Sequence, residues 1–422
     1  HDAKYKLLVT SDEMKAKELF EQYRLFEDNV FYFPAKDYLF YQSDIRGNAL
    51  TRDRMKAIEA VLTEGQYTVV TTIDALMNKL PSKESFEEGM IAISAEDSVE
   101  MNGLRSKLVA MGYEAVGSCE HPGEYAIRGG IIDIYPLTSD LPVRIELWGD
   151  EVDSIRSYDP GTQKSIEKLE MVVVFPAVEL ILSQEQIETG LQRMEDEMKQ
   201  RYEAYRSQMK TEEAYHLKTY TERVIETTRE WGLSQELEPH LTYFEDNLHS
   251  FVDFMPKDAL VFVDEIQKVI AKGKATEAEF SDAMVHRVEQ GYMLKGQLDM
   301  LFGAKEVLGK LSLHPTTLMS VLDARNEVLN AEKHFSILAQ GVNSYNGSFE
   351  LLVKELTAYK KRKYKVLLVC ASPTKGARLA EDLTAEGLTA VYTTDEERGI
   401  QPGEIVIITG TVARGFEYPD SG

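Results

Sequence analysis

Within the segment 142–156, residues 143–148 alternate between two faces of a strand. Val143, Ile145 and Leu147 face one way, and Arg144, Glu146 and Trp148 face the other way. Because successive side chains of a strand point to opposite faces of its sheet, this pattern predicts a strand with one buried face. Gly149-Asp150 follows at once and predicts a tight turn into a partner strand. This part of the chain is therefore expected to form an antiparallel β-hairpin.

Strands and helices alternate on both sides of the hairpin. Residues 1–86 hold short apolar runs separated by helical spacings, which is typical of a parallel, doubly wound sheet. From Ser183 the spacing is helical, a Met and Tyr stripe at 187–209 indicates a packing seam between helices, and a strand returns at 259–265. The prediction is a multidomain α/β chain. Its regions are a doubly wound lobe (1–86), a small, mostly antiparallel β domain (87–178), helices that return to the lobe (179–335), and a second small α/β unit (336–422).

Composition limits the classes of function. The 422 residues include 47 Lys and Arg against 71 Asp and Glu, a formal net charge of −24. Such an acidic chain is expected to bind DNA weakly and without specificity at most, because phosphate recognition depends on Lys and Arg. The two cysteines, Cys119 and Cys370, exclude a disulfide scaffold and fit a cytoplasmic protein. The histidines show no metal-binding spacing, so no metal site is predicted.

The two ends of the sequence predict a fragment of a longer protein. The chain starts at His1 without an initiator Met or an apolar leader, and it stops at Gly422 soon after a turn signal. Its longest apolar runs, such as 366–371, are far shorter than the ~20 residues that span a bilayer. We therefore expect a monomeric fragment without a membrane partner.

The strand that returns at 259–265 ends in Asp264-Glu265. Nucleotide hydrolases place a magnesium-binding acid and a water-polarising acid at such a strand end. They also need a phosphate loop of the form G-x-x-x-x-G-K-[ST], and the sequence contains none. We therefore predict no catalytic residues, no metal and no cofactor here, and neither tight binding nor hydrolysis of ATP.

Lys360-Lys-Arg-Lys363 is the densest run of positive charge. The favoured interpretation is that these cations follow a helix C-terminus and offset its dipole. The alternative is a patch that binds nucleic acid.

Arg128, Arg144 and Trp148 are the candidate partner-binding residues. Trp and Arg on a strand face that is not part of a core are the residue types that anchor protein interfaces. An ordinary cross-strand ladder, with Glu146 neutralising an arginine, explains the same pattern. The residues alone leave both interpretations open.

Several segments around these residues carry a specific family pattern. They are GEYAIRGGIIDIYP at 123–136, RIELWGDE at 144–151, IRSYDP at 155–160, TVVTTIDAL at 68–76, DFMPKDALVFVDE at 253–265, YNGSF at 345–349 and RGFE at 414–417. Together they closely resemble the N-terminal, UvrB-like region of the bacterial transcription-repair coupling factor family (Mfd). The β-domain segments also resemble the matching module of the excinuclease subunit UvrB. Only the short stretch 35–48 follows the second strand, where UvrB inserts a long hairpin, and this favours the coupling factor.

The resemblance implies a degenerate helicase-like (RecA-like) lobe, an inserted UvrB-like module and a further small α/β domain. It implies that the β domain recruits UvrA in transcription-coupled nucleotide excision repair. RNA polymerase, double-stranded DNA, ATP and Mg²⁺ are then expected to bind domains beyond this fragment, which belong to an ATP-dependent DNA translocase. The alternatives are a UvrB-type excinuclease subunit with ATPase activity and an acidic scaffold without enzymatic activity.

The resemblance also assigns roles to individual residues. Arg128, Arg144 and Trp148 match the positions through which the family's β domain contacts UvrA. Asp264 and Glu265 match a vestigial Walker B motif, and any phosphate loop is expected to lie upstream of residue 1.

Overall fold

The computed structural model describes the chain in the ranges 3–36, 46–232, 235–322, 329, 331–342, 345, 347–395, 398–412 and 414–420. Its internal contacts form two compact units. The first comprises residues 1–16 and 31–330, and the second comprises residues 17–30 and 331–422. Most of the stretch that distinguishes the coupling factor family from UvrB, residues 37–45, lies outside the described ranges. Within those ranges, no helix is long and apolar enough to cross a membrane.

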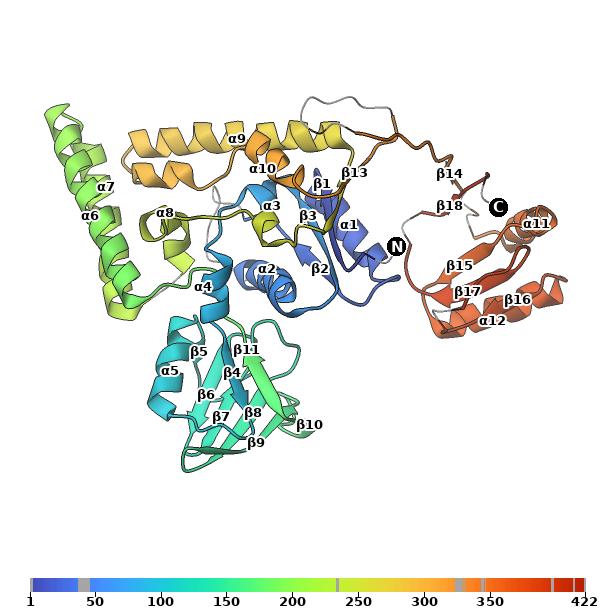
Figure 1. Cartoon of the computed structure of the whole chain (residues 1–422), viewed down its shortest axis with the longest axis horizontal. Helices are drawn as coiled ribbons and strands as arrows, with labels where there is room; N and C mark the ends of the chain where they lie inside the picture. The colour runs from blue at the N-terminus through green and yellow to red at the C-terminus, as the bar shows by residue number, and fades with distance from the viewer. Residues whose placement is uncertain are drawn as a thin grey trace. The chain divides into compact units, whose positions relative to one another are not determined.

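A five-stranded sheet lies in the first unit (Figure 1). Its strands are, in spatial order, β13 (Thr316–Met319), β12 (Leu260–Asp264), β1 (Tyr5–Thr10), β3 (Tyr67–Thr72) and β2 (Val30–Phe33). β1 pairs in parallel with β3 and β12, and β12 pairs in parallel with β13. Strands that are far apart in the sequence therefore build one sheet.

Helices cover both faces of this sheet. α2 (Arg46–Thr63) contacts β3, and α9 (Ile266–Glu289) contacts β1 and β12 from the other side (Figure 1). The short helices α3 (Ile73–Met77) and α10 (Ala304–Leu311) pack against α9. Every residue of β3 is buried, as expected for a strand with helices on both faces.

The next part of the chain forms two smaller sheets. The strands of a six-stranded sheet are, in spatial order, β10 (Ser165–Leu169), β9 (Glu151–Tyr158), β8 (Val143–Trp148), β7 (Ile131–Ile134), β6 (Glu124–Arg128) and β5 (Glu114–Ala115). All neighbours are antiparallel except β5 and β6. β4 (Ile91–Ser94) and β11 (Met171–Val174) form the second sheet, and α5 (Met101–Ala110) lies between β4 and β5 in the chain. The predicted hairpin is confirmed, because Trp148 pairs with Glu151 and Gly149 takes a φ of +66°.

Helices follow β11. They are α6 (Gln184–Ser207), α7 (Thr211–Trp231), the 3₁₀ turn η1 (Gln235–His240), α8 (Leu241–Phe244) and the 3₁₀ turn η2 (Phe251–Phe254); η3 (Lys295–Asp299) follows α9. Ser183 and Gln186 form a capping box at the start of α6. The Met and Tyr stripe of α6 is a packing seam, since its buried members share one core with residues of α7 and α8.

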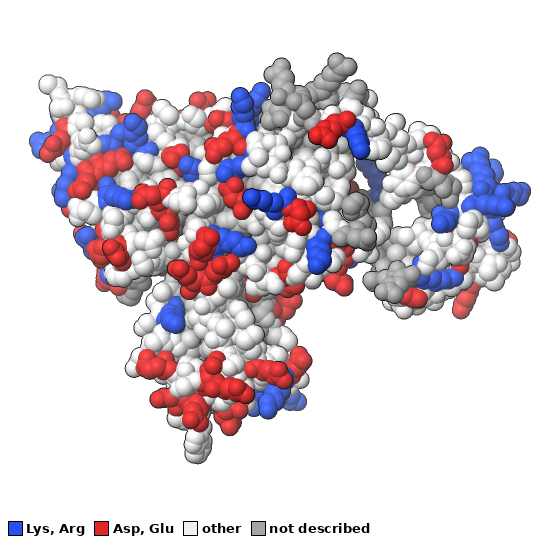
Figure 2. All heavy atoms as spheres, viewed as in Figure 1, with Lys and Arg blue, Asp and Glu red and all other residues white. Residues whose placement is uncertain are grey.

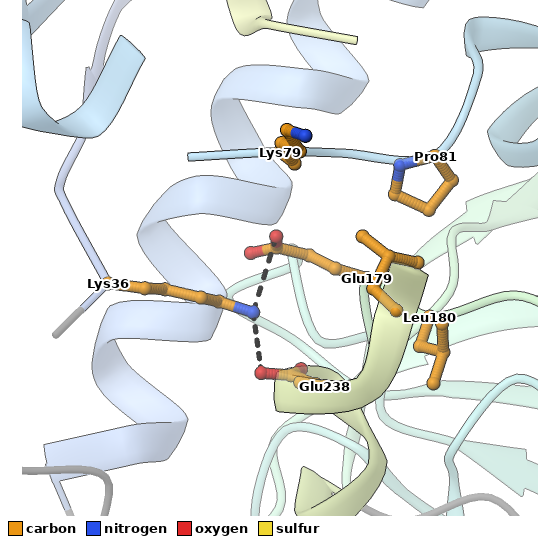
Figure 3. Close-up of a pocket in the computed structure, with 7 residues that line it drawn as sticks. Lys36, Lys79, Pro81, Glu179, Leu180 and Glu238 are labelled. Carbon is orange, nitrogen blue, oxygen red and sulfur yellow. Dashed lines mark hydrogen bonds and ion pairs between the residues drawn. The ribbon is translucent and has the colours of Figure 1, made fainter. Parts of the chain in front are cut away.

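Four charged side chains meet in the interior of the first unit, and Figure 3 shows three of them, Lys36, Glu179 and Glu238. Lys36 Nζ lies 2.6 Å from Glu238 Oε2 and 3.3 Å from Glu179 Oε2. Arg54 on α2 is fully buried, and its Nε lies 2.6 Å from Glu179 Oε1. Asn78 Oδ1 accepts hydrogen bonds from the Lys36 backbone N–H and from Arg54 Nη1. This buried ion cluster ties α2 to the chain that follows β2, to the chain that follows β11, and to η1.

The second unit is a small α/β structure. Its parallel sheet has the order β15 (Val366–Cys370), β17 (Ile405–Thr409) and β16 (Ala390–Tyr392). α11 (Phe349–Lys361) and α12 (Pro373–Ala385) contribute Leu356 and Leu383 to its core. β14 (Gln340–Gly341) and β18 (Phe416–Glu417) form a separate short ladder. The α/β class that the sequence predicts, with several sheets, is confirmed.

Candidate functional site

One face of the six-stranded sheet carries the arginines that the sequence singles out. Asp133 on β7 pairs across the sheet with Arg144 on β8, and Arg128 on β6 reaches the same carboxylate. The alternate residues Ile132 and Ile145 are fully buried on the core side. The strand alternation predicted from the sequence therefore places both arginines on the face away from the core.

Asp133 is the centre of this polar face. Its side chain is 1% exposed, and both carboxylate oxygens accept charge-assisted hydrogen bonds. Oδ1 lies 2.6 Å from Arg144 Nε, whereas Oδ2 lies 2.9 Å from Arg144 Nη2 and 2.6 Å from Arg128 Nη2. One buried carboxylate thus orients two guanidinium groups, and their charges compensate for its burial.

Arg144 is held from three directions. Besides Asp133, its Nη2 donates to Gln163 Oε1 at 2.8 Å, and its guanidinium carbon lies 4.5 Å from the ring centre of Tyr158. The side chain is 15% exposed, whereas that of Arg128 is 49% exposed. The fork formed by Nε and Nη2 is engaged by Asp133, so it is not presented to a partner carboxylate. The Nη1 group of Arg144 and the half-exposed Arg128 are the donors left for a partner.

Glu146 takes part in a separate cross-strand pair. Its carboxylate forms an ion pair with Arg156 on β9 and accepts a hydrogen bond from Ser154 Oγ at 3.1 Å. The cross-strand ladder is therefore present on this face, and the arginine that Glu146 neutralises is Arg156.

Trp148 ends β8 and is 83% exposed. The turn that follows Arg128 is hydrogen-bonded to Leu147, the residue before Trp148. The Leu147 N–H donates to the Gly130 C=O at 2.8 Å. A Cβ on Gly130 would lie 2.9 Å from the carbonyl oxygen of Leu147, so only glycine fits this approach. The Arg128 turn and Trp148 are thereby fixed at the same end of the sheet.

Asp264 and Glu265 stand at the carboxyl end of β12. Burial raises the pKa of Asp264. The positive charge of Lys15 and a hydrogen bond with Thr10 act in the opposite direction. Glu265 adopts a left-handed φ of +52°, and its Oε1 accepts a hydrogen bond from the backbone N–H of Val321 at 3.0 Å. The Glu265 carboxylate is therefore engaged by a backbone N–H group next to the sheet.

The junction between β1 and the following helix α1 (Glu13–Tyr23) lies beside these acids. In doubly wound sheets a phosphate group binds at such a junction, against the N-terminus of the helix. Here the junction is Ser11-Asp12, without glycine, and the Asp12 carboxylate accepts a hydrogen bond from the Lys15 backbone N–H at 2.8 Å. The sheet order places this strand-to-helix junction at Ser11-Asp12, and the sequence has no phosphate loop there.

Three residues of the polar face were not singled out from the sequence. They are Asp133, Tyr158 and Gln163. A signal for Asp133 exists, since it is the one charged residue within the apolar run Ile131-Ile-Asp-Ile134. A lone acid in a strand with one buried face indicates a paired charge.

Comparison with known proteins finds a similarity for this part of the chain. Residues 91–180 match the family model of the UvrB interaction domain. This segment of the chain is therefore similar to the UvrB interaction domain. The match includes β4 to β11 and therefore the whole polar face.

Curated relatives match nearly the whole chain. The chain is 27% identical to the transcription-repair-coupling factor of Bacillus subtilis over 98% of its own length and 35% of the relative. It is 26% identical to the proteins of the same name from Staphylococcus haemolyticus and Staphylococcus aureus, over 99% of its length and 35% of theirs. The chain thus spans about a third of these relatives, and the resemblance inferred from the sequence motifs is confirmed.

Proposed function

We propose that this chain recruits UvrA in transcription-coupled nucleotide excision repair of DNA. The observation that carries the proposal is the UvrB interaction domain at 91–180, which presents an ordered polar face with an exposed Trp148 at its edge. Arg and Trp are the residue types that anchor protein interfaces, and their fixed side chains reduce the entropy lost on binding.

The docking surface consists of Arg128, Arg144 and Trp148, with Asp133 as the residue that positions the two arginines. The surrounding acidic chain adds selectivity, because a local cationic patch on a negative protein disfavours most wrong partners. UvrA is the partner of this surface; RNA polymerase and the double-stranded DNA along which a motor would move are partners of other parts of the longer relatives.

The five-stranded sheet is, on this proposal, a degenerate helicase-like lobe into which the UvrB interaction domain is inserted. The helical segment 179–335 returns to this lobe, and residues 336–422 form the further small α/β domain. ATP and Mg²⁺ are assigned to a motor in the part of the relatives that this chain does not span. The protein acts in the cytoplasm, and the chain is monomeric.

A titration with UvrA tests the proposal. The purified chain is added to labelled UvrA, with and without an excess of UvrB. We expect saturable binding that UvrB displaces, because the domain resembles that of UvrB and should occupy the same surface. Absence of binding would favour an acidic scaffold, and binding that UvrB leaves unchanged would contradict docking through this domain.

A further inference from the structure

The basic run at the end of α11, residues 360–365, carries more positive charge than is required to offset the dipole of a helix C-terminus. A helix C-terminus has a partial charge of about −0.5, which one or two cations in the last turn offset. Lys360 and Lys361 already lie in that turn. Arg362, Lys363 and Lys365 follow beyond the helix and are exposed. The interpretation favoured from the sequence thus explains only part of this cluster.

The five cations, Lys360 to Lys363 and Lys365, are not paired with acidic side chains in the part of the chain that the structure describes. Their charge therefore remains available to a partner. Gly403 packs beside this segment, and the nearby Glu404 is engaged in an ion pair with Arg398.

The local charge balance also differs from that of the chain. Residues 331–422 contain 11 Lys and Arg against 12 Asp and Glu, whereas the whole chain has 47 against 71. Five of these 11 cations lie within 360–365. Figure 2 shows the blue side chains gathered over α11. A positive field can therefore persist here although the chain as a whole is acidic.

The backbone keeps a lysine where glycine is favoured. Lys363 has a φ of +62°, and α11 ends with hydrogen bonds from Lys363 N–H to Lys360 C=O and from Tyr364 N–H to Tyr359 C=O. A residue with a Cβ is strained in this left-handed position relative to glycine. Such an outlier supports a role for the side chain that occupies it.

We propose that the basic cluster, Lys360 to Lys363 with Lys365, binds the phosphate backbone of DNA. Lysine is depleted at protein–protein interfaces, whereas exposed lysines neutralise phosphates as point charges. Four of the five cations are lysines. Binding is independent of DNA sequence and weak at physiological salt. Its role is to hold the chain near the DNA duplex while the UvrB interaction domain binds its own partner.

Fluorescence anisotropy with a labelled duplex tests this proposal. The cluster variant carries Lys361→Gln, Arg362→Gln, Lys363→Gln and Lys365→Gln. The control carries Lys107→Gln, Lys257→Gln, Lys274→Gln and Lys305→Gln, which are exposed lysines of the first unit. Both variants lower the net charge equally. Circular dichroism confirms that each is folded.

We expect the cluster variant to bind duplex at least about ten-fold more weakly than the parent near 50 mM salt, and the control to bind as the parent does. The parent's log affinity should fall against log salt with a slope of about −4, which the cluster variant loses. Equal loss in both variants, or no loss in the cluster variant, would overturn the proposal. A parent that binds poly-glutamate but not duplex would overturn it in favour of an acidic protein partner. UvrA affinity should be the same in all three proteins.

Discussion

At the residue scale, the polar face is organised around the carboxylate of Asp133. Strand alternation alone could not identify Asp133 as its centre. The alternation correctly assigns Arg144 and Trp148 to the face opposite the core. The register between β7 and β8 places Asp133 directly opposite Arg144. Register follows from turns and packing along the whole sheet, so a pattern within one strand does not contain it.

Replacement of Asp133 tests whether the arginines must be positioned. Asp133→Asn leaves both guanidinium groups without their shared anion, and we expect UvrA affinity to fall about ten-fold and stability to fall by about 1–3 kcal/mol. Binding is measured by titration, and stability by urea unfolding. Glu146→Gln is the matched control, because it breaks a pair on the same face with Arg156. Equal effects of the two substitutions would show that Asp133 has no special positioning role.

At the element scale, the buried ion cluster connects segments whose contact the sequence does not reveal. Its members, Lys36, Arg54, Glu179 and Glu238, come from four segments, and each is at most 6% exposed in its side chain. By contrast, the Ser183 capping box and the Gly149 turn were predictable, because their partners lie within a few residues. Local chemistry is visible in a sequence, whereas long-range charge pairing depends on the tertiary fold.

Glu179→Gln should destabilise the first unit by about 3–5 kcal/mol, because it leaves Arg54 and Lys36 buried with too little negative charge. The urea midpoint of the variant measures this change. Asp140→Asn is the control, since Asp140 pairs with Arg52 and Lys56 but is 85% exposed. We expect the control to change stability by less than about 1 kcal/mol. A comparable loss in both variants would contradict a special contribution from burial.

The same cluster predicts a pH dependence. Burial alone would raise the pKa of Glu179, but Arg54 and Lys36 lower it below its usual value. A carboxylate with a lowered folded-state pKa contributes its full stability above the unfolded-state pKa of about 4.3 and loses it as the pH falls further. The difference in unfolding free energy between the parent and Glu179→Gln should therefore shrink below about pH 4. A difference that stays constant from pH 7 to pH 3 would refute this linkage.

At the scale of the whole molecule, the alternation of strands and helices was sufficient to predict the α/β class. The order of the strands was not predictable, because β12 pairs with β1 although a long segment containing several helices separates the two strands in the sequence. That order places the β1–α1 junction beside Asp264, and Asp12 already occupies the helix N-terminus there. A second anion at this junction would meet a fixed carboxylate.

We therefore expect no ATP binding by this chain. Calorimetry with Mg-ATP should give no saturable heat, and Asp264→Ala should leave that result unchanged. Stoichiometric binding that Asp264→Ala abolishes would show that the junction functions as a nucleotide site.

The central claim is that UvrA docks on the polar face, and Trp148 provides its most direct test. Trp148→Ala removes an exposed side chain that supports nothing in the core, so the protein should remain folded. Met209→Ala removes another highly exposed apolar side chain, at the turn between α6 and α7, and is the matched control. In a titration with UvrA, the account predicts that Trp148→Ala weakens binding about 30-fold, corresponding to about 2 kcal/mol, and that Met209→Ala binds as the parent does. Unchanged affinity of Trp148→Ala would contradict it.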